Sequence, residues 1–363
     1  METSNVNRRE FIKACALSGV AATVSASTLR GKDDRKVRLG FIGVGGRGSG
    51  LLANCLTIPG VEITAISDVI AANLSKAQAV VEKAGGKKPA GYSKNEEDYR
   101  NLLKRDDVDG VVIATPWEWH LPMSIDAMKA GKYAATEVGP ANSIEECWEL
   151  IRTHEETRVP CMMLENYCYQ RSVMAILNMV RKGLFGELIH CQCGYEHDLR
   201  GRIVQGKGTG IELKEGGDYR SHHNRTRNGD VYPTHGVGPM ANCLNIDRGN
   251  RFVYLTSTAS KARGLREWTL DNLGREHPAA KTEWAMGDIV TTVIKCHHGE
   301  TIIINHDVAL PRPSPAFPSI GRVQGTKAIW EKSVDGIYVD KRSPGGKWEQ
   351  FSKYLAEFEH PLW

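Results

Sequence analysis

The sequence lacks the features that would indicate a membrane-spanning, nucleic-acid-binding or fibrous protein. No apolar run reaches the roughly 18 residues that a helical span requires. No block of lysine or arginine is present, and 47 basic against 43 acidic side chains leave a net charge of only +4, which argues against a nucleic-acid partner. Repeats and low-complexity tracts are absent as well. At about 150 residues per domain, the 363 residues predict two globular domains.

Metal-binding patterns are missing too. The nine cysteines include no C-x-x-C pair and no cysteine–histidine spacing suited to zinc, so we predict no metal site. Cys191 and Cys193 alternate with other residues, as on one face of a strand. The pairs His222-His223 and His297-His298 are predicted to lie in solvated loops.

The N-terminus has the pattern of an export signal. Arg8 and Arg9 are adjacent, an uncharged run follows from Ala14 to Ala26, and the run closes on small residues. A charged region, a short apolar region and a small-residue end are typical of a cleaved signal, and the paired arginines indicate the twin-arginine route. We therefore predict that residues 1–30 are a signal and linker and that the protein is periplasmic or otherwise exported. Because this route carries folded proteins, we expect mostly free, buried thiols, although disulfides stay open.

A dinucleotide-binding unit follows. Residues 36–42 are predicted to form a buried strand, which leads into Gly43-Val-Gly45-Gly46-Arg47-Gly48 and then a helix. In the G-x-G-x-x-G pattern, Gly43 permits the tight turn, Gly45 lets the backbone approach the pyrophosphate, and Gly48 permits close helix packing. Asp68 ends the next predicted strand, twenty residues after Gly48. A carboxylate there accepts hydrogen bonds from the ribose and repels a 2′-phosphate, which favours NAD over NADP.

Alternating strands and helices continue to about residue 166. Predicted strands at 109–114, 132–136 and 160–164 end in Thr115-Pro-Trp-Glu-Trp-His120, in Glu137-Val-Gly-Pro140 and in Glu165-Asn-Tyr167. Ligands of an open parallel sheet bind at such strand ends. We therefore predict an α/β fold, with a Rossmann domain over residues 36–166.

The remaining residues, 167–363, have a different pattern. Predicted strands near 188–195, 252–259, 288–296 and 301–308 follow a helix at 172–182. This order predicts an α+β domain with a mostly antiparallel open sheet. The polar stretch from 200 to 230 is predicted to be either a solvated surface loop or a functional one.

At this point the chain resembles a known family. The two predicted domains resemble the glucose–fructose oxidoreductase/inositol dehydrogenase (Gfo/Idh/MocA) superfamily, but its usual Glu-Lys-Pro segment reads Glu137-Val-Gly-Pro here. A closer resemblance, covering nearly all of the chain after the signal, is to glycoside hydrolase family 109, the NAD-dependent α-N-acetylgalactosaminidases. The motifs that carry it are Trp117-Glu-Trp-His120, Thr136-Glu-Val138, Leu164-Glu-Asn166, Cys193-Gly-Tyr-Glu-His-Asp-Leu199, Arg227-Asn-Gly-Asp-Val-Tyr-Pro-Thr-His-Gly-Val-Gly-Pro239 and His306-Asp-Val-Ala-Leu-Pro-Arg-Pro313.

The resemblance implies glycoside hydrolysis in which NAD takes part, a recognised exception to two-carboxylate catalysis. The sugar is oxidised at C3, loses the proton on C2, eliminates the glycosidic oxygen, adds water and is reduced again, with no net redox change. His235 with Tyr232 is the best candidate for moving protons. Glu137 is expected to bind cofactor, act as acid or base, or orient the sugar.

The same resemblance assigns the remaining site residues. With the glycines of the loop, those expected to contact NAD are Gly46, Arg47, Asp68, Trp117, Glu118, Trp119, His120, Glu137, Val138 and Asn166. Those expected to contact the glycoside are Tyr195, Arg220, Tyr232, Pro233, Thr234 and His235.

Two departures from the family pattern leave alternatives open. Ser314 stands where the family has a tyrosine that reaches the sugar, and family members continue beyond Trp363, so the second domain is expected to lack its last helices and loops. A periplasmic sugar oxidoreductase with tightly bound nicotinamide, or a non-catalytic sugar- or NAD-binding protein, therefore remains an alternative. The natural glycan and its anomer are not determined. A homo-oligomer is expected because open sheet faces in this superfamily often pair.

Overall fold

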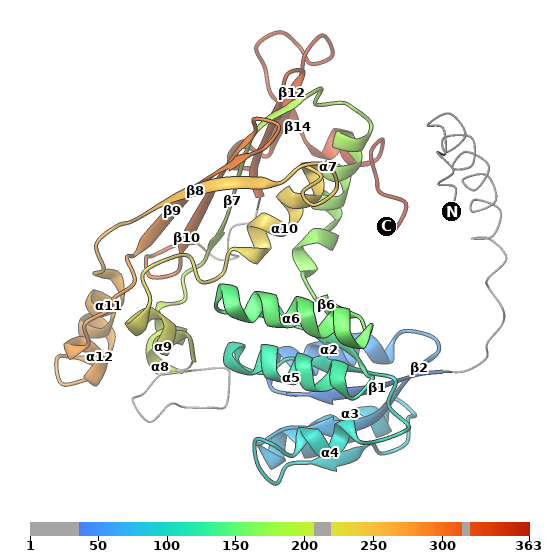
Figure 1. Cartoon of the computed structure of the whole chain (residues 1–363). Helices are drawn as coiled ribbons and strands as arrows, with labels where there is room; N and C mark the ends of the chain where they lie inside the picture. Colours follow the sequence, from blue (N-terminus) through green and yellow to red (C-terminus); the bar gives the residue numbers. More distant parts are fainter. Residues whose placement is uncertain (1–35, 207–218, 314–319) are drawn as a thin grey trace, which may run out of the picture.

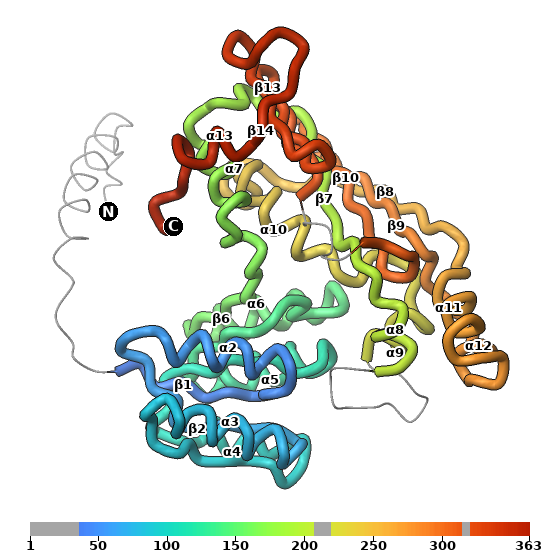
Figure 2. The backbone as a smooth tube through the Cα atoms, turned by 180° about the vertical axis from the view of Figure 1, so that it is seen from behind, coloured from blue at the N-terminus to red at the C-terminus, as the bar shows by residue number. Residues whose placement is uncertain are grey.

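The computed structural model describes residues 36–206, 219–313 and 320–363 of the chain. The predicted export signal and Ser314 lie outside the described residues. Two sheets organise the described part, one of six strands and one of eight. Figures 1 and 2, which view the molecule from opposite sides, both show α7 (Arg171–Arg181) rising from the six-stranded sheet toward the eight-stranded one.

The six-stranded sheet is parallel throughout and has the order β3-β2-β1-β4-β5-β6. Its strands are β1 (Val37–Ile42), β2 (Val61–Ser67), β3 (Ala90–Tyr92), β4 (Gly110–Ile113), β5 (Tyr133–Thr136) and β6 (Cys161–Met163). Its helices are α2 (Gly46–Leu56), α3 (Ala71–Lys83), α4 (Tyr99–Leu103), α5 (His120–Lys129) and α6 (Ile144–Thr157). The strand order reverses between β1 and β4, which creates a ligand-binding crevice at the carboxyl ends of these strands.

Both faces of this sheet are buried. Ile42 and Val111 belong to one hydrophobic cluster, whereas their neighbours Phe41 and Val112 belong to another. Successive residues of a strand point to opposite faces, so the two clusters lie on opposite sides of the sheet. This burial explains why the inner parts of the central strands, Phe41-Ile42 of β1 and Val111-Val112-Ile113 of β4, are continuous apolar runs.

The eight-stranded sheet has the order β14-β13-β12-β11-β7-β10-β9-β8. Its strands are β7 (Leu188–Glu196), β8 (Phe252–Ala259), β9 (Ile289–Cys296), β10 (Thr301–Asp307), β11 (Ile320–Gly325), β12 (Ala328–Glu331), β13 (Gly336–Val339) and β14 (Glu349–Gln350). Only the β7–β10 pair is parallel. Helices α7 and α10 (Thr234–Cys243) pack on one face through the largest hydrophobic cluster. The predicted fold class is confirmed.

The predictions of a loop at 200–230 and of a solvated loop at His222-His223 were wrong in part. Most of the described residues between 200 and 230 form helices α8 (Arg200–Gln205) and α9 (Tyr219–Thr226). His223 lies on α9 and is buried, with its ring against Trp117. Hydrophobic periodicity misses this helix because most of its buried residues are polar, including Arg220 and Asn224. The pair His297-His298 is exposed, as predicted.

Eight cysteines fall within the described residues, and all eight are free thiols. Cys191 and Cys193 are buried on one face of β7, as their spacing predicts, and Cys243 and Cys296 are buried as well. The remaining helices and connections are short: α11 (Gly264–Leu273), α12 (Pro278–Lys281) and α13 (Ser352–Leu355). In the described part of the chain, no helix has the length and apolarity needed to cross a bilayer.

Candidate active site

A cavity of about 410 Å³ is lined by residues from both parts of the chain. The parallel sheet contributes the glycine loop after β1 and the ends of β2, β4 and β5, and the second part contributes α9 and the start of α10. The lining residues that carry polar or aromatic side chains are Arg47, Ser67, Asp68, Asn73, Glu96, Tyr99, Thr115, Trp117, Trp119, His120, Glu137, Asn166, Tyr167, Arg202, Tyr219, Arg220, Tyr232 and His235.

The glycine loop has the shape that a dinucleotide requires. Gly43 has φ +83°, and a Cβ there would lie 2.9 Å from the backbone of Ala114. A Cβ on Gly48 would lie 2.0 Å from the carbonyl oxygen of Gly43, so only glycine lets α2 approach β1. Helix α2 begins at Gly46 with no capping side chain and no acidic residue in its first turn. Its free N–H groups and positive dipole end therefore suit a pyrophosphate.

Asp68 is fixed at the carboxyl end of β2 by two backbone groups. The amide of Val44 donates to Oδ2 and the amide of Ile70 donates to Oδ1, each at 2.8 Å. These bonds tie the acid to the glycine loop and orient it. Each carboxylate oxygen has a second lone pair, so a ribose hydroxyl can still donate to Asp68.

The segment after β4 forms an aromatic wall. Trp117 and Trp119 line the cavity on the short helix η1 (Trp117–Trp119). His120 borders it, yet its nitrogens lie 2.8 Å from the carbonyl oxygen of Thr115 and 3.2 Å from that of Gly139. Burial lowers the pKa of His120, and a neutral ring carries one N–H, so it donates to one of these two carbonyl oxygens. Glu118 does not line the cavity. Its Oε1 lies 3.1 Å from Nε2 of His223.

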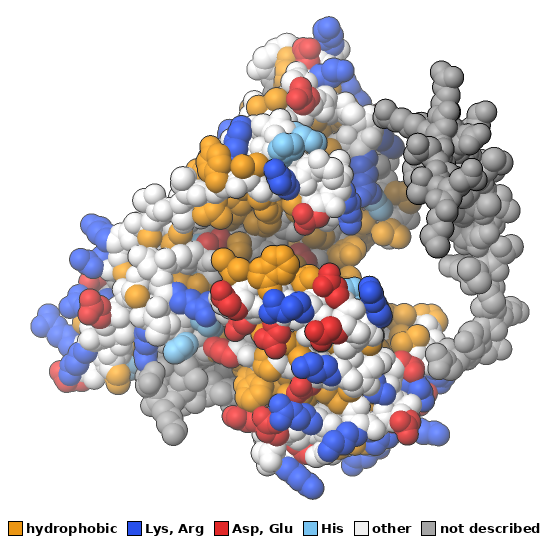
Figure 3. Space-filling view, viewed as in Figure 1, with side chains coloured by type: hydrophobic (Ala, Val, Ile, Leu, Met, Phe, Trp, Pro, Cys, Tyr) orange, Lys and Arg blue, Asp and Glu red, His pale blue; other side chains and the backbone are white. Residues whose placement is uncertain are grey.

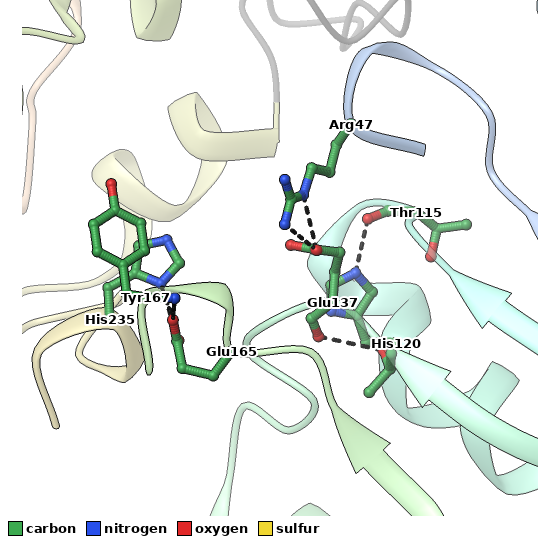
Figure 4. A network of polar contacts seen from close by, with 8 residues as sticks. Arg47, Thr115, His120, Glu137, Glu165, Tyr167 and His235 are labelled. Atoms are coloured by element: carbon green, nitrogen blue, oxygen red, sulfur yellow. Dashed lines mark hydrogen bonds and ion pairs between the residues drawn. The ribbon is translucent and has the colours of Figure 1, made fainter. Parts of the chain in front are cut away.

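Glu137 and Arg47 form an ion pair across the cavity. Nε and Nη2 of Arg47 lie 2.8 and 2.7 Å from Oε1 of Glu137 (Figure 4). Glu137 is buried at the end of β5, whereas Arg47 on α2 is half exposed. The pair joins the start of α2, next to the glycine loop, to the end of β5. Val138, the next residue, is buried against Trp117 and Tyr232.

His235 and Glu165 form the second polar pair of the site. Nδ1 of His235 lies 2.7 Å from Oε1 and 2.9 Å from Oε2 of Glu165, and both side chains are buried (Figure 4). His235 lies in the first turn of α10, and Glu165 follows the end of β6. Figure 4 shows this pair on one side and the Arg47–Glu137 pair on the other.

Aromatic rings surround His235. The Tyr232 ring meets it edge-on at 4.9 Å and stacks on Trp117 at 5.2 Å. Tyr195 on β7 packs 4.4 Å from Tyr232 and 5.6 Å from His235. Burial raises the pKa of Tyr232 well above its usual value, so its hydroxyl stays protonated and can act as a hydrogen-bond donor.

Arg220 completes the wall from α9. Its guanidinium lies 4.7 Å from the ring centroid of Tyr219 and 5.2 Å from that of Trp117. The side chain is buried yet borders the cavity. Such stacked arginines combine a fixed charge with hydrogen-bond donors, which suits recognition of an oxygen-rich ligand.

Most of the residues assigned from the sequence border the cavity. Five do not: Gly48, Glu118, Tyr195, Pro233 and Thr234. Gly48 acts in packing, Tyr195 supports the tyrosine and histidine that do line the cavity, and Pro233 and Thr234 form the start of α10. Glu165, Tyr167, Thr115 and Tyr219 were not assigned. The sequence signals that pointed to them were the strand-end position of Glu165 and Tyr167 and, for Glu165, its place in the Leu164-Glu-Asn166 motif.

Potential metal ligands do not cluster in this site. Within residues 36–206, 219–313 and 320–363, no group of three or more histidine, cysteine, aspartate or glutamate side chains is arranged to hold a metal ion.

Comparison with known families accounts for both parts of the site. The model for an oxidoreductase family with an NAD-binding Rossmann fold matches residues 37–165. The model for the C-terminal domain of glycosyl hydrolase 109 matches residues 169–363. The chain belongs to glycosyl hydrolase family 109. It is therefore a glycoside hydrolase, with a domain built to bind a nicotinamide cofactor.

Individual relatives agree with this membership. A glycosyl hydrolase family 109 protein of Parabacteroides distasonis is 42% identical over 98% of this chain and 82% of its own length. An alpha-N-acetylgalactosaminidase of Tannerella forsythia is 41% identical with the same coverage. Among solved structures, an aldose-aldose oxidoreductase of Caulobacter crescentus has a TM-score of 0.61 at 16% identity, covering 89% of this chain and 88% of its own. That likeness supports the fold.

Proposed function

We propose that the protein hydrolyses a terminal α-N-acetylgalactosamine, or a related sugar, by oxidation, elimination, addition of water and reduction, with no net redox change. The observation that carries the proposal is one cavity that joins a dinucleotide-type glycine loop to a buried His235–Tyr232 pair. A glycosidase using two carboxylates alone would not need the loop. The name of the Tannerella forsythia relative, an alpha-N-acetylgalactosaminidase, supports the choice of sugar.

The residues present fit NAD. The backbone of Gly43, Gly45 and Gly46 would bind the pyrophosphate at the start of α2. The Asp68 carboxylate would accept hydrogen bonds from the ribose hydroxyls. A 2′-phosphate beside the Asp68 carboxylate would be repelled, which favours NAD over NADP. When bound, the nicotinamide supplies a reversible hydride acceptor for C3 of the sugar.

The side chains of the second part handle the protons. His235 accepts the proton of the C3 hydroxyl, and Tyr232, which burial keeps protonated, donates a hydrogen bond to the same oxygen. The ketone at C3 makes the C2 proton acidic, so a base of ordinary strength can remove it. Glu137, across the cavity, is positioned at the strand end to orient the sugar or to act as acid or base. Arg220 and the aromatic wall hold the ring.

A panel of 4-nitrophenyl α- and β-glycosides tests this function without any added oxidant. We expect release of nitrophenol from the α-N-acetylgalactosaminide. In heavy water the elimination route places deuterium at C2 of the released sugar, and NADH does not accumulate. Turnover without deuterium at C2 would refute the mechanism. Accumulation of NADH with free sugar, and no cleavage of any glycoside, would instead identify a sugar oxidoreductase.

We also propose that the protein is exported by the twin-arginine route, on the basis of Arg8, Arg9 and the uncharged run that follows. Expression of the full chain in a bacterium with this pathway should give periplasmic protein of reduced mass. Replacing both arginines by lysine should retain the full-length form in the cytoplasm. Equal export of the double variant would overturn the proposal.

A further inference from the structure

The contact between His235 and Glu165 is a fixed one. Both carboxylate oxygens lie within 2.9 Å of Nδ1, and Oε1 also accepts the backbone N–H of Tyr167 at 3.0 Å. Glu165 is therefore oriented by its own strand-end segment before it meets the histidine. This arrangement leaves the carboxylate little freedom to turn away from the ring.

Packing also holds the imidazole in place. The Tyr167 ring stacks on it at 4.1 Å, and the Tyr232 ring meets it edge-on at 4.9 Å. Helix α10 comes close to Glu165 because residue 238 is glycine: a Cβ there would lie 3.0 Å from Cγ of Glu165. The His235 ring is thus held by the carboxylate, by two aromatic rings and by its own helix.

A carboxylate can only accept hydrogen bonds. When Glu165 is ionised, the hydrogen between the two groups must be carried by Nδ1 of His235. The lone pair of the neutral ring then lies on Nε2, the nitrogen not held by the glutamate, on a side chain that lines the cavity. The carboxylate would also stabilise the imidazolium formed when Nε2 takes a proton.

We propose that Glu165 is a positioning residue for catalysis: it fixes His235 as the tautomer whose Nε2 accepts the substrate proton, and it stabilises the resulting cation. This inference rests on the proposed function for its catalytic meaning. The tautomer itself does not depend on that function, so the two can be tested separately.

The tautomer is tested by ¹⁵N NMR on protein labelled at histidine. The His235 signals are identified as those lost in His235→Asn. In the wild type we expect Nδ1 to carry the hydrogen and Nε2 to have the shift of an unprotonated nitrogen. In Glu165→Gln the side-chain amide can donate to Nδ1, so we expect the hydrogen to move to Nε2. A wild-type ring already protonated at Nε2, or a ring unchanged by the substitution, would overturn the proposal.

Kinetics test the consequence for turnover. We expect Glu165→Gln to lower kcat by a factor on the order of 10²–10⁴, with KM and the amount of bound NAD little changed. Glu165→Asp keeps the charge and should recover at least part of that loss. Glu156→Gln, an exposed residue of α6, is the matched control and should behave as wild type.

The outcomes separate the two proposals. If the wild type cleaves no glycoside, the proposed function fails while the NMR result still decides the tautomer. If the wild type is active and Glu165→Gln retains its full kcat, Glu165 has no positioning role. If both Glu165 variants show a lower kcat, a higher KM and less bound NAD together, Glu165 has a structural role only, and the proposal is rejected as well.

Discussion

Burial decides the protonation of individual side chains in this site. It lowers the pKa of His197 and of His306 to about 4, so both rings are neutral where they pack beside Tyr195. It keeps Tyr232 protonated. His235 differs from these two histidines because, among the described residues, it alone of the three has a carboxylate partner, which is the reason that the proposed mechanism uses His235.

Replacing Tyr232 by phenylalanine should remove a hydrogen-bond donor without changing the ring packing. We expect kcat to fall by roughly 10²-fold or more, the range typical of a lost hydrogen-bond donor to the reacting oxygen, while NAD remains bound. Steady-state kinetics on the aryl glycoside measure this. Tyr169→Phe, at an exposed position outside the cavity, is the control. Equal activity of the two variants would remove Tyr232 from the mechanism.

Asp230 should make stability depend on pH. Its Oδ1 accepts the N–H of Tyr232, whereas the buried Oδ2 has no hydrogen-bond partner among the described residues. Burial raises the pKa of Asp230 from 3.8 to about 6. Because the folded pKa is raised, its contribution to stability is present below the unfolded pKa near 4 and is lost as pH rises through 6.

Asp230→Asn keeps the acceptor and removes this titration. Relative to wild type, the variant should gain up to about 3 kcal/mol of unfolding free energy between pH 4 and pH 8, from about two pH units at 1.36 kcal/mol each. Urea unfolding at the two pH values measures it. An equal difference between variant and wild type at both values would contradict the assignment.

At the scale of elements, close approaches of backbone position the site. Gly48 lets α2 lie against β1, and Gly236 lets α10 approach β7, where a Cβ would lie 2.9 Å from the amide nitrogen of Gly194. The two helices carry Arg47 and His235 respectively. Glycine is needed at these two positions because a Cβ would clash with the neighbouring backbone. At a position of the same helices where a Cβ has free space, glycine is not needed.

Gly48→Ala and Gly50→Ala test this on a single helix. The added methyl at 48 meets the Gly43 carbonyl, whereas nothing lies within 4 Å of one at 50. We expect Gly48→Ala to lower the unfolding free energy by roughly 2 kcal/mol or more and to weaken NAD retention. Gly50→Ala should be neutral or stabilising by up to about 1 kcal/mol. Thermal unfolding and cofactor content measure both, and similar losses in both variants would refute the argument.

At the scale of the whole molecule, the second sheet leaves apolar side chains uncovered. Val253, Tyr254 and Leu255 on the edge strand β8 are each more than half exposed, and Ile189 on β7 and Val293 on β9 are exposed as well. Figure 3 shows apolar side chains gathered on this side of the molecule, over β8 and over α6. Exposed apolar surface of this kind favours association.

We therefore predict a homo-oligomer that uses this sheet. Light scattering on the purified chain should give a multiple of the monomer mass. Leu255→Glu should shift the protein toward monomer, whereas Ile58→Glu, at an exposed position after α2, should not. A monomeric wild type at micromolar concentration would contradict the prediction.

Local sequence predicted the elements that have strong local signals. The strand–glycine loop–helix unit and the long apolar strands lie where the pattern placed them, within a few residues. Strands β11 to β14 were not predicted. They lie outside the regular alternation of strands and helices that made the short strands β4 and β5 recognisable. Helix α9 was not predicted because its buried side chains are polar.

The sequence by itself determined the dinucleotide loop, the position of Asp68 and the family, and it singled out His235 as a candidate, because each depends on residues close together in the chain or on motifs in a fixed order. The tertiary structure alone decided the pairings. Glu165 meets His235 across 70 positions and Arg47 meets Glu137 across 90. Such contacts form only when strand ends, helix starts and glycine approaches are assembled, and no local pattern encodes the distance between them.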